Sequence, residues 1–220
     1  VGVMKPIATG GMWIRQDGGP RCVSPDAVRL WRAAGSDDPL SLINPVCFRE
    51  PLAPYPASVR AHQPIRWSSI QRAFRTLAQQ HRFLIVEGIG GLLVPLSRQR
   101  TVVDLIRLLR LPCLVVSRRR LGTLNHTLLT VAHAQRERLQ VLGVALNAAE
   151  APSPEAEAKL AERTNPAVLR TCLTVPVIGE LPHRHAFANG AWSSRALAEW
   201  VGRSLDPRFL RRVVRWAGRG

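Results

Sequence analysis

The chain has 220 residues, of which 46% are hydrophobic, and a formal net charge of +16 at pH 7. This length is enough for one well-filled domain, and no run of about 18 apolar residues occurs that could cross a membrane. The N-terminus also lacks the basic, apolar and small-residue zones of a signal peptide, so we predict a soluble, cytoplasmic protein that binds no membrane.

Five short, nearly continuous apolar runs are typical of strands covered on both faces. They lie at residues 1–5, 83–87, 113–117, 141–147 and 175–181. Helical patterns separate them, at residues 24–35, 65–81, 101–110, 123–138 and 154–164, and two more follow near the C-terminus. This alternation predicts an α/β fold, a doubly wound, mainly parallel sheet with helices on both faces. We expect one domain over residues 1–205 and a basic C-terminal helix or tail over residues 206–220.

Local signals mark several helix ends. Ser24 is a candidate N-cap with Pro25 at the first helical position, and Gly35 ends the same pattern. Thr101 and Asp104 have the spacing of a capping box. Residues 36–65 contain six prolines, which predicts a long irregular connection of the kind that serves as a lid or binding loop.

The basic charge raises the possibility of nucleic-acid binding. Arginines are concentrated at residues 98–120 and 203–219, but aromatic residues make up only 5% of the chain and no zinc-finger, RNP or GXXG signature occurs. We therefore do not expect specific nucleic-acid binding, and we interpret residues 208–220 as a solvated terminal helix rather than a helix on an anionic surface. The four cysteines are scattered without a CxxC pair, which predicts reduced, semi-buried thiols and no zinc site.

Ligands of open α/β sheets bind beyond the carboxyl ends of the strands, and polar residues occur there. Glu87 ends an apolar strand and is followed by Gly88, Gly90 and Gly91. A carboxylate in this position needs a cation or backbone N–H groups, which favours a Mg²⁺ or nucleotide contact over a Glu satisfied by its own turn.

Lys5 ends the first strand, and Thr9 follows shortly after it. An ammonium group at this edge suits a developing oxyanion or a phosphoryl group, and Thr9 can bind the same ligand. The alternative is a lysine that extends from the sheet edge into solvent. Asp26 serves either as a metal ligand or as an ordinary acidic residue in a first helical turn, and Asn147 either contacts a base or begins a turn.

Residues 122–125 begin a helix whose free N–H groups can bind an anion such as a small carboxylate. His126 and His133 lie on nearly one face of this helix, but without a third ligand we do not expect them to bind a metal.

These segments together resemble the dethiobiotin synthetase family, the ATP-dependent enzymes of biotin synthesis. The resemblance rests on KPIATG, SPDAVRL, NPVCFREPLAPYPA, VEGIGGLLVPL, LPCLVVSRRRLGTLNHTLLT, GVALN and GELP, which occur in the family's order over residues 1 to about 185. It implies a nucleotide-binding domain with a P-loop NTPase-like fold and a homodimer with the substrate site at the subunit interface. It also implies an ATP-dependent carbon–nitrogen cyclo-ligase, which uses Mg²⁺, ATP and CO₂ to convert 7,8-diaminononanoate to dethiobiotin.

By position in these motifs, the resemblance implies a role for each residue. Lys5 is the expected catalytic lysine, and Asp26 and Glu87 are the expected Mg²⁺-associated carboxylates. Substrate binding is expected at Thr9, Thr123, Leu124 and Asn125. Nucleotide binding is expected at Asp26, Glu87, Gly88, Ile89, Gly90, Asn147, Pro182, His183 and Arg184.

The chain departs from the family pattern in one important respect. Family members carry a strand and a glycine-rich phosphate loop ending in Gly-Lys-Thr ahead of the KPIATG segment, whereas no GxxxxGK[ST] motif occurs here. We therefore expect a sequence that is short of about one N-terminal βα unit. The alternatives are an inactive, truncated paralogue that keeps the fold and dimer, and a basic binder of nucleic acid or anionic surfaces.

Overall fold

A computed structural model describes residues 1–16, 19–185 and 193–217. It divides into two compact units, Val1–Arg110 and Leu111–Gly220, which we call the N-terminal and C-terminal units and describe separately. Both combine strands with helices, and most strand pairs are parallel, which confirms the predicted α/β class.

The described residues of the N-terminal unit form three pairs of strands. β1 (Gly2–Met4) pairs in parallel with β6 (Leu84–Val86), and β2 (Ile7–Ala8) pairs in parallel with β5 (Val46–Cys47). β3 (Met12–Gln16) and β4 (Gly19–Val23) form an antiparallel hairpin that the apolar patterns did not reveal. The helices are α1 (Pro25–Ala34), α2 (Leu40–Ile43), α3 (Pro54–Arg60), α4 (Trp67–Gln80) and α5 (Val102–Leu109).

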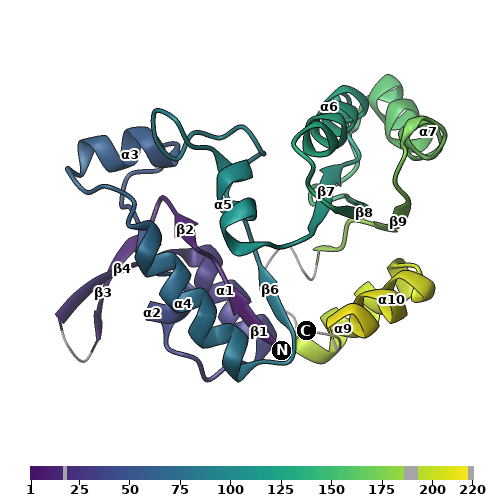
Figure 1. Cartoon of the computed structure of the whole chain (residues 1–220). Coiled ribbons are helices and arrows are strands. Elements are labelled where there is room, and N and C mark those ends of the chain that lie inside the picture. The colour runs from purple at the N-terminus through teal and green to yellow at the C-terminus, as the bar shows by residue number, and fades with distance from the viewer. Residues whose placement is uncertain (17–18, 186–192, 218–220) are drawn as a thin grey trace. The chain divides into compact units, whose positions relative to one another are not determined.

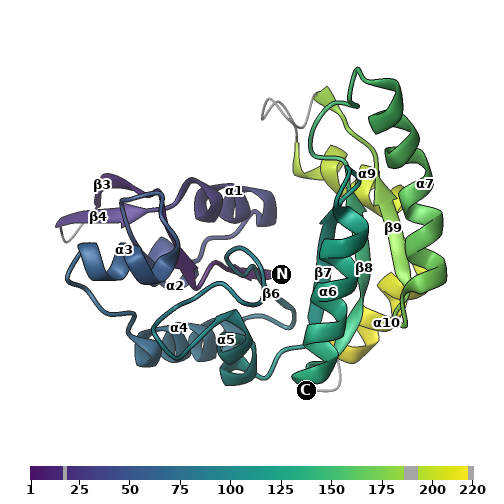
Figure 2. The same ribbon diagram turned by 90° about the horizontal axis from the view of Figure 1, so that it is seen from above.

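α1 and α4 pack on opposite sides of β1, as Figures 1 and 2 show. Val3, Ala27 and Ile43 form a buried cluster, so the residues beside Lys5 are fixed by core packing. The predicted helix ends are confirmed. The Ser24 side chain accepts the N–H of Asp26, Gly35 is the left-handed C-cap of α1, and Thr101 with Asp104 forms a capping box.

The prediction for residues 36–65 was wrong. The segment is not one irregular loop, because it contains α2, β5 and α3. Pro54 lies at the first turn of α3, where its missing N–H would have no intrahelical acceptor, so proline there begins a helix rather than excluding one.

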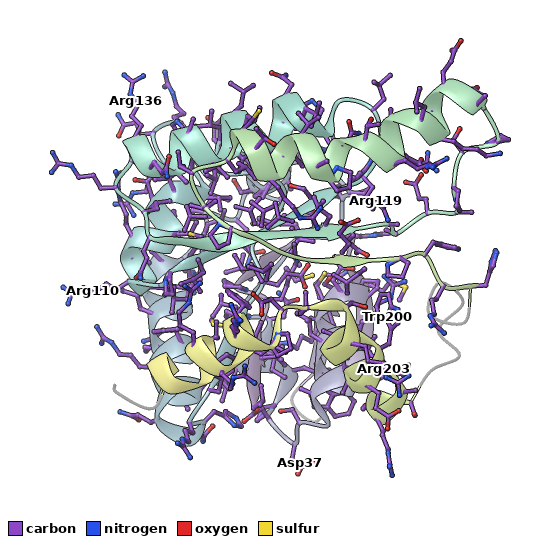
Figure 3. The ribbon with its side chains drawn as sticks, turned by 90° about the vertical axis from the view of Figure 1, so that its right-hand side faces the viewer. Asp37, Arg110, Arg119, Arg136, Trp200 and Arg203 are labelled. Carbon is purple, nitrogen blue, oxygen red and sulfur yellow. The ribbon has the colours of Figure 1, made fainter. Side chains whose placement is uncertain are left out.

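The C-terminal unit has one parallel sheet in the order β7 (Cys113–Arg118), β8 (Val141–Asn147), β9 (Val177–Leu181). Helices α6 (Thr123–Arg136) and α7 (Ala156–Cys172) cover one face, and α9 (Ser194–Ser204) and α10 (Pro207–Ala217) cover the other (Figure 3). α7 continues well beyond the predicted residue 164 and accommodates Pro166 in its interior.

Alternation along β8 explains this three-layer arrangement. Val144 and Leu146 pack toward α6 and α7, whereas Ala145, between them, packs with Phe209 of α10. Side chains alternate between the two faces of a strand, so a continuous apolar run supplies both cores. Phe209 is only 6% exposed, and Leu210 and Val213 of α10 pack against the same cluster. That residues 1–205 form one domain stays a prediction.

No helix among the described residues is both long and apolar enough to cross a membrane.

Candidate active site

Lys5 follows β1 and is the one charged residue that is buried among the described residues. Lys5 as a whole is 4% exposed, and its backbone N–H donates to the carbonyl of Ile43 at 2.7 Å. Its Nζ donates to Glu87 Oε1 at 2.9 Å and to the carbonyl of Gly88 at 2.8 Å. The side chain therefore does not extend into solvent, and its charge is compensated by specific oxygen atoms.

Glu87 meets Lys5 because β6 is the parallel neighbour of β1. Met4 pairs with Val86, and the Glu87 N–H donates to the Met4 carbonyl at 2.8 Å. Both residues thus leave the carboxyl edge of the same strand pair, as the parallel arrangement requires.

Asp26 reaches the same ammonium from a different element. It lies in the first turn of α1, which the Ser24 cap begins, and its Oδ2 is 3.9 Å from Lys5 Nζ. The Asp26 and Glu87 side chains are 53% and 47% exposed, whereas that of Lys5 is 5% exposed. The ammonium thus lies beneath two carboxylates that face solvent. These three groups carry one net negative charge, and the exposed Arg29 guanidinium lies 3.5 Å from Asp26 Oδ1.

These two carboxylates fit a magnesium ion by their chemistry. Mg²⁺ prefers oxygen ligands and is commonly held by one or two carboxylates together with water and substrate phosphates. Among the described residues, no group of three or more His, Cys, Asp or Glu side chains could hold a metal by itself. Two carboxylate ligands would leave the remaining coordination positions to water and phosphate oxygens.

Asn44 supports this cluster and was missed by the sequence analysis. Its residue is 1% exposed, its Nδ2 donates to the carbonyls of Lys5 at 2.8 Å and Val46 at 3.0 Å, and its Oδ1 accepts the Ser24 N–H at 3.3 Å. One side chain thus joins the end of β1, the start of β5 and the cap of α1. No local sequence signal distinguishes such an asparagine from one in a turn.

The remaining predicted residues of this unit lie on two loops. Thr9 directly follows β2 and is half-buried. Gly88, Ile89 and Gly90 follow Glu87, and Gly90 has a φ of 63°, a conformation that favours glycine. The structure therefore brings Lys5, Asp26, Glu87 and Gly88 into contact, while Thr9 lies in the segment after β2 and Gly90 in the segment after Glu87.

The predicted substrate-binding residues at the start of α6 lie in the C-terminal unit. Gly122 is the N-cap, and the first turn contains Thr123, Leu124 and Asn125. Thr123 is buried, its hydroxyl donates to the Arg118 carbonyl, and its N–H donates to the Arg120 carbonyl at 3.1 Å. Both hydrogen-bond donors of Thr123 thus hold the turn. The first-turn N–H groups that could bind an anion are therefore those of Leu124 and Asn125.

Asn147 lies at the carboxyl end of β8, between Arg118 of β7 and Leu181 of β9. Pro182, His183 and Arg184 follow β9, so the four predicted nucleotide-binding residues of the C-terminal unit lie at one edge of this sheet. Pro182 and Arg184 are exposed, and the Nε2 atom of His183 is buried without a hydrogen-bond partner in the described structure.

The same edge carries an ion-pair group that the sequence analysis did not identify. Arg119, labelled in Figure 3, lies 3.4 Å from Glu180 Oε2 through its Nη2, and Arg170 of α7 lies 2.6 Å from Glu180 Oε1. The Asn165 side chain donates to the carbonyls of Arg119 and Arg120 and fixes the connection from β7 to α6. These contacts join residues far apart in sequence, so neither spacing nor residue type indicated them.

Comparison with known proteins identifies the family to which the chain belongs. A family model described as "AAA domain" matches residues 1–190. The ATP-dependent dethiobiotin synthetase of Thermodesulfovibrio yellowstonii is 38% identical over 190 residues, which cover 83% of this chain and 76% of that protein.

Two further relatives bear the same name. The enzyme of Endomicrobium trichonymphae is 41% identical over 150 residues, 66% of this chain and 64% of its own length. The enzyme of Anaeromyxobacter dehalogenans is 45% identical over 122 residues, 56% of this chain and 55% of its own length. The matches thus span about half to three quarters of these relatives. The chain belongs to the dethiobiotin synthetase family of ATP-dependent ligases, which function in biotin biosynthesis, and has its P-loop NTPase-like α/β fold.

Proposed function

We propose that this protein converts 7,8-diaminononanoate, CO₂ and ATP into dethiobiotin, ADP and phosphate. The observation that carries the proposal is the buried Lys5 ammonium beneath Asp26 and Glu87 at the carboxyl edge of β1 and β6. The relatives' printed names give the activity for those proteins, and the cluster gives a chemical reason for it here.

The reaction forms two new carbon–nitrogen bonds to the carbon of CO₂, one from each amine of the substrate. One substrate amine attacks CO₂ and loses a proton, which gives a carbamate. A carbamate oxygen then attacks the γ-phosphorus of ATP and ADP leaves. Finally the second amine attacks the carbamate carbon, loses a proton and expels phosphate.

Among these reaction steps, Lys5 has the central role in the transfer of the phosphoryl group to the carbamate. Its ammonium neutralises the carbamate oxygen and the phosphoryl group as charge moves between them, and its fixed hydrogen bonds mean that little reorganisation is needed. Asp26 and Glu87 would hold Mg²⁺, which when bound neutralises phosphate oxygens. Thr9 would orient the diamine end of the substrate.

The residues of the C-terminal unit have binding roles in this proposal. The first-turn amides of Leu124 and Asn125 would bind the substrate carboxylate across the interface of a homodimer. Asn147 and the segment of Pro182, His183 and Arg184 would contact the nucleotide. Gly88, Ile89 and Gly90 of the N-terminal unit are proposed as nucleotide-binding residues on the family resemblance alone.

A labelling assay tests the proposal. Purified protein is incubated with ATP, Mg²⁺, diaminononanoate and labelled bicarbonate, and labelled dethiobiotin and ADP are measured. We expect both products in equal amounts, and a loss of at least about 100-fold in kcat for Lys5→Ala, since removal of one such donor commonly costs this much. Glu157→Gln, an exposed change on α7, is the matched control and should leave turnover unchanged.

The chain contains no GxxxxGK[ST] motif, so ATP binding is measured separately by calorimetry. Binding of the diamine without ATP binding or product would contradict the proposal and support a non-enzymatic paralogue. Product formation that persists in Lys5→Ala would contradict the assigned role of the lysine.

A further inference from the structure

Two cysteine sulfur atoms meet in the N-terminal unit, although the residues are far apart in sequence. Cys22 of β4 and Cys47 of β5 have their Sγ atoms 3.2 Å apart, and both residues are half-buried free thiols. None of the roles proposed above uses either thiol, although Cys47 lies within the NPVCFREPLAPYPA segment.

Gly11 makes this approach possible. A Cβ atom at residue 11 would overlap both the Cys22 and the Cys47 sulfur, so the two thiols fill the space that a side chain would need. The Gly11 N–H also donates to the Phe48 carbonyl at 3.0 Å, which holds this backbone against the end of β5. The pair is therefore a packed feature and not two mobile side chains that meet by chance.

We propose that Cys22 and Cys47 form a site of reversible oxidation. A small-molecule disulfide such as oxidised glutathione oxidises the two thiols, and the Cys22–Cys47 disulfide that results links β4 to β5. This modification site is separate from the proposed enzymatic activity and does not depend on it. Closing the bond requires the sulfur atoms to approach by about 1 Å, which side-chain rotation can supply.

The exchange proceeds in two balanced steps. The Cys22 thiol loses its proton to solvent and attacks one sulfur of oxidised glutathione, and one glutathione thiolate leaves. The Cys47 thiol then loses its proton and attacks Cys22 Sγ, which expels the second glutathione. The protein loses two protons and two electrons, and one oxidised glutathione takes them up to become two reduced molecules.

The surroundings determine this order. Burial, together with the hydrogen bond and charge of Cys22, raises the pKa of the Cys47 thiol, while the nearby Arg21 guanidinium opposes this effect. A thiol of raised pKa is a slow first nucleophile, so Cys47 is the resolving partner. Once the mixed disulfide forms at Cys22, the two sulfur atoms are already adjacent.

The link would enclose part of the candidate active site. The closed loop of residues 22–47 contains Asp26 and Asn44, whose side chains contact Lys5. Oxidation would thus restrict the two segments that hold the catalytic lysine.

Peptide mapping of the full chain tests the proposal directly. Trypsin places Cys22 and Cys47 on separate peptides, residues 22–29 and 33–49. After treatment with oxidised glutathione and alkylation of the remaining thiols, we expect these peptides joined, and separated again by dithiothreitol. Alkylation of both thiols after oxidation, or a bond from either one to Cys113 or Cys172, would overturn the proposal.

Variants and a thermal measurement provide independent checks. Cys47→Ser should accumulate glutathione on Cys22, whereas Cys22→Ser should leave Cys47 mostly free, and the reverse would overturn the assigned order. Cys172→Ser removes an exposed thiol and should leave the link unchanged. Closing a loop of this size should raise Tm by about 5–10 °C in unmodified protein, an increase that dithiothreitol removes. An unchanged Tm in protein that mapping shows to be linked would contradict a restricting effect.

Discussion

Replacing Lys5 by methionine tests the electrostatic design of the site. The change keeps an unbranched apolar stem of similar length and removes the ammonium. It eliminates the 2.9 Å hydrogen bond to Glu87 and the 2.8 Å hydrogen bond to the Gly88 carbonyl. Hydrogen bonds to charged groups contribute about 1.5–3 kcal/mol each when shielded from water.

Exposure reduces this contribution. The Glu87 side chain is 47% exposed, so water replaces part of what the ammonium supplied. We therefore expect the free energy of unfolding to fall by about 2 kcal/mol, well below the sum of two shielded bonds.

Double-mutant cycles measured by urea unfolding isolate each partner. Lys5→Met combined with Glu87→Gln should give a coupling energy of about 1 kcal/mol, because these groups are in direct contact. Lys5→Met combined with Asp26→Asn should give less than about 0.5 kcal/mol, since the atoms are 3.9 Å apart and Asp26 is more than half exposed.

The order of the two coupling energies is the decisive result. Coupling to Asp26 that equals or exceeds coupling to Glu87 would refute the geometry, and additivity in both cycles would show that the ammonium is not fixed by either carboxylate. Circular dichroism of each variant confirms that the comparison is made between folded proteins.

Two further changes test the packing around the site, both measured by urea unfolding. Gly11→Ala should lower stability by about 1–3 kcal/mol, because the new Cβ overlaps two sulfur atoms, whereas Gly202→Ala in α9, where an added Cβ meets nothing within 4 Å, should raise it by about 0.5–1 kcal/mol. Equal effects of the two glycine changes would contradict the close approach at residue 11. Asn44→Ala should cost about 2–4 kcal/mol, because it leaves backbone groups of three segments without their partner, and a loss below about 0.5 kcal/mol would show that water replaces the amide.

Much of the secondary structure was predictable because its causes are local. β8 coincides with its apolar run, and the caps of α1 and α5 depend on side chains within three residues of the helix start. The positions of Lys5 and Glu87 at strand ends were also predictable, since an apolar run that stops at a charged residue marks the edge of a sheet.

Proline-rich and short elements were not predictable in the same way. α2, β5 and α3 contain four, two and seven residues, too few for a periodic pattern to emerge. α7 passes through Pro166 because its Asn165, Pro166 and Leu169 are buried against the rest of the C-terminal unit, and this packing outweighs the local cost of proline.

The sequence by itself determined the order of the longer helices and of the strands formed by apolar runs, the strand-end charges and the membership of a family of ATP-dependent ligases. Only the tertiary structure decided that the Lys5 ammonium lies near both Asp26 and Glu87, that the Asn44 side chain bonds to three segments, and that the Cys22 and Cys47 sulfur atoms are in contact. The physical reason is the same in each case. These contacts depend on which strands pair and on the path of the chain that connects them. Neither can be read from the spacing of a few residues.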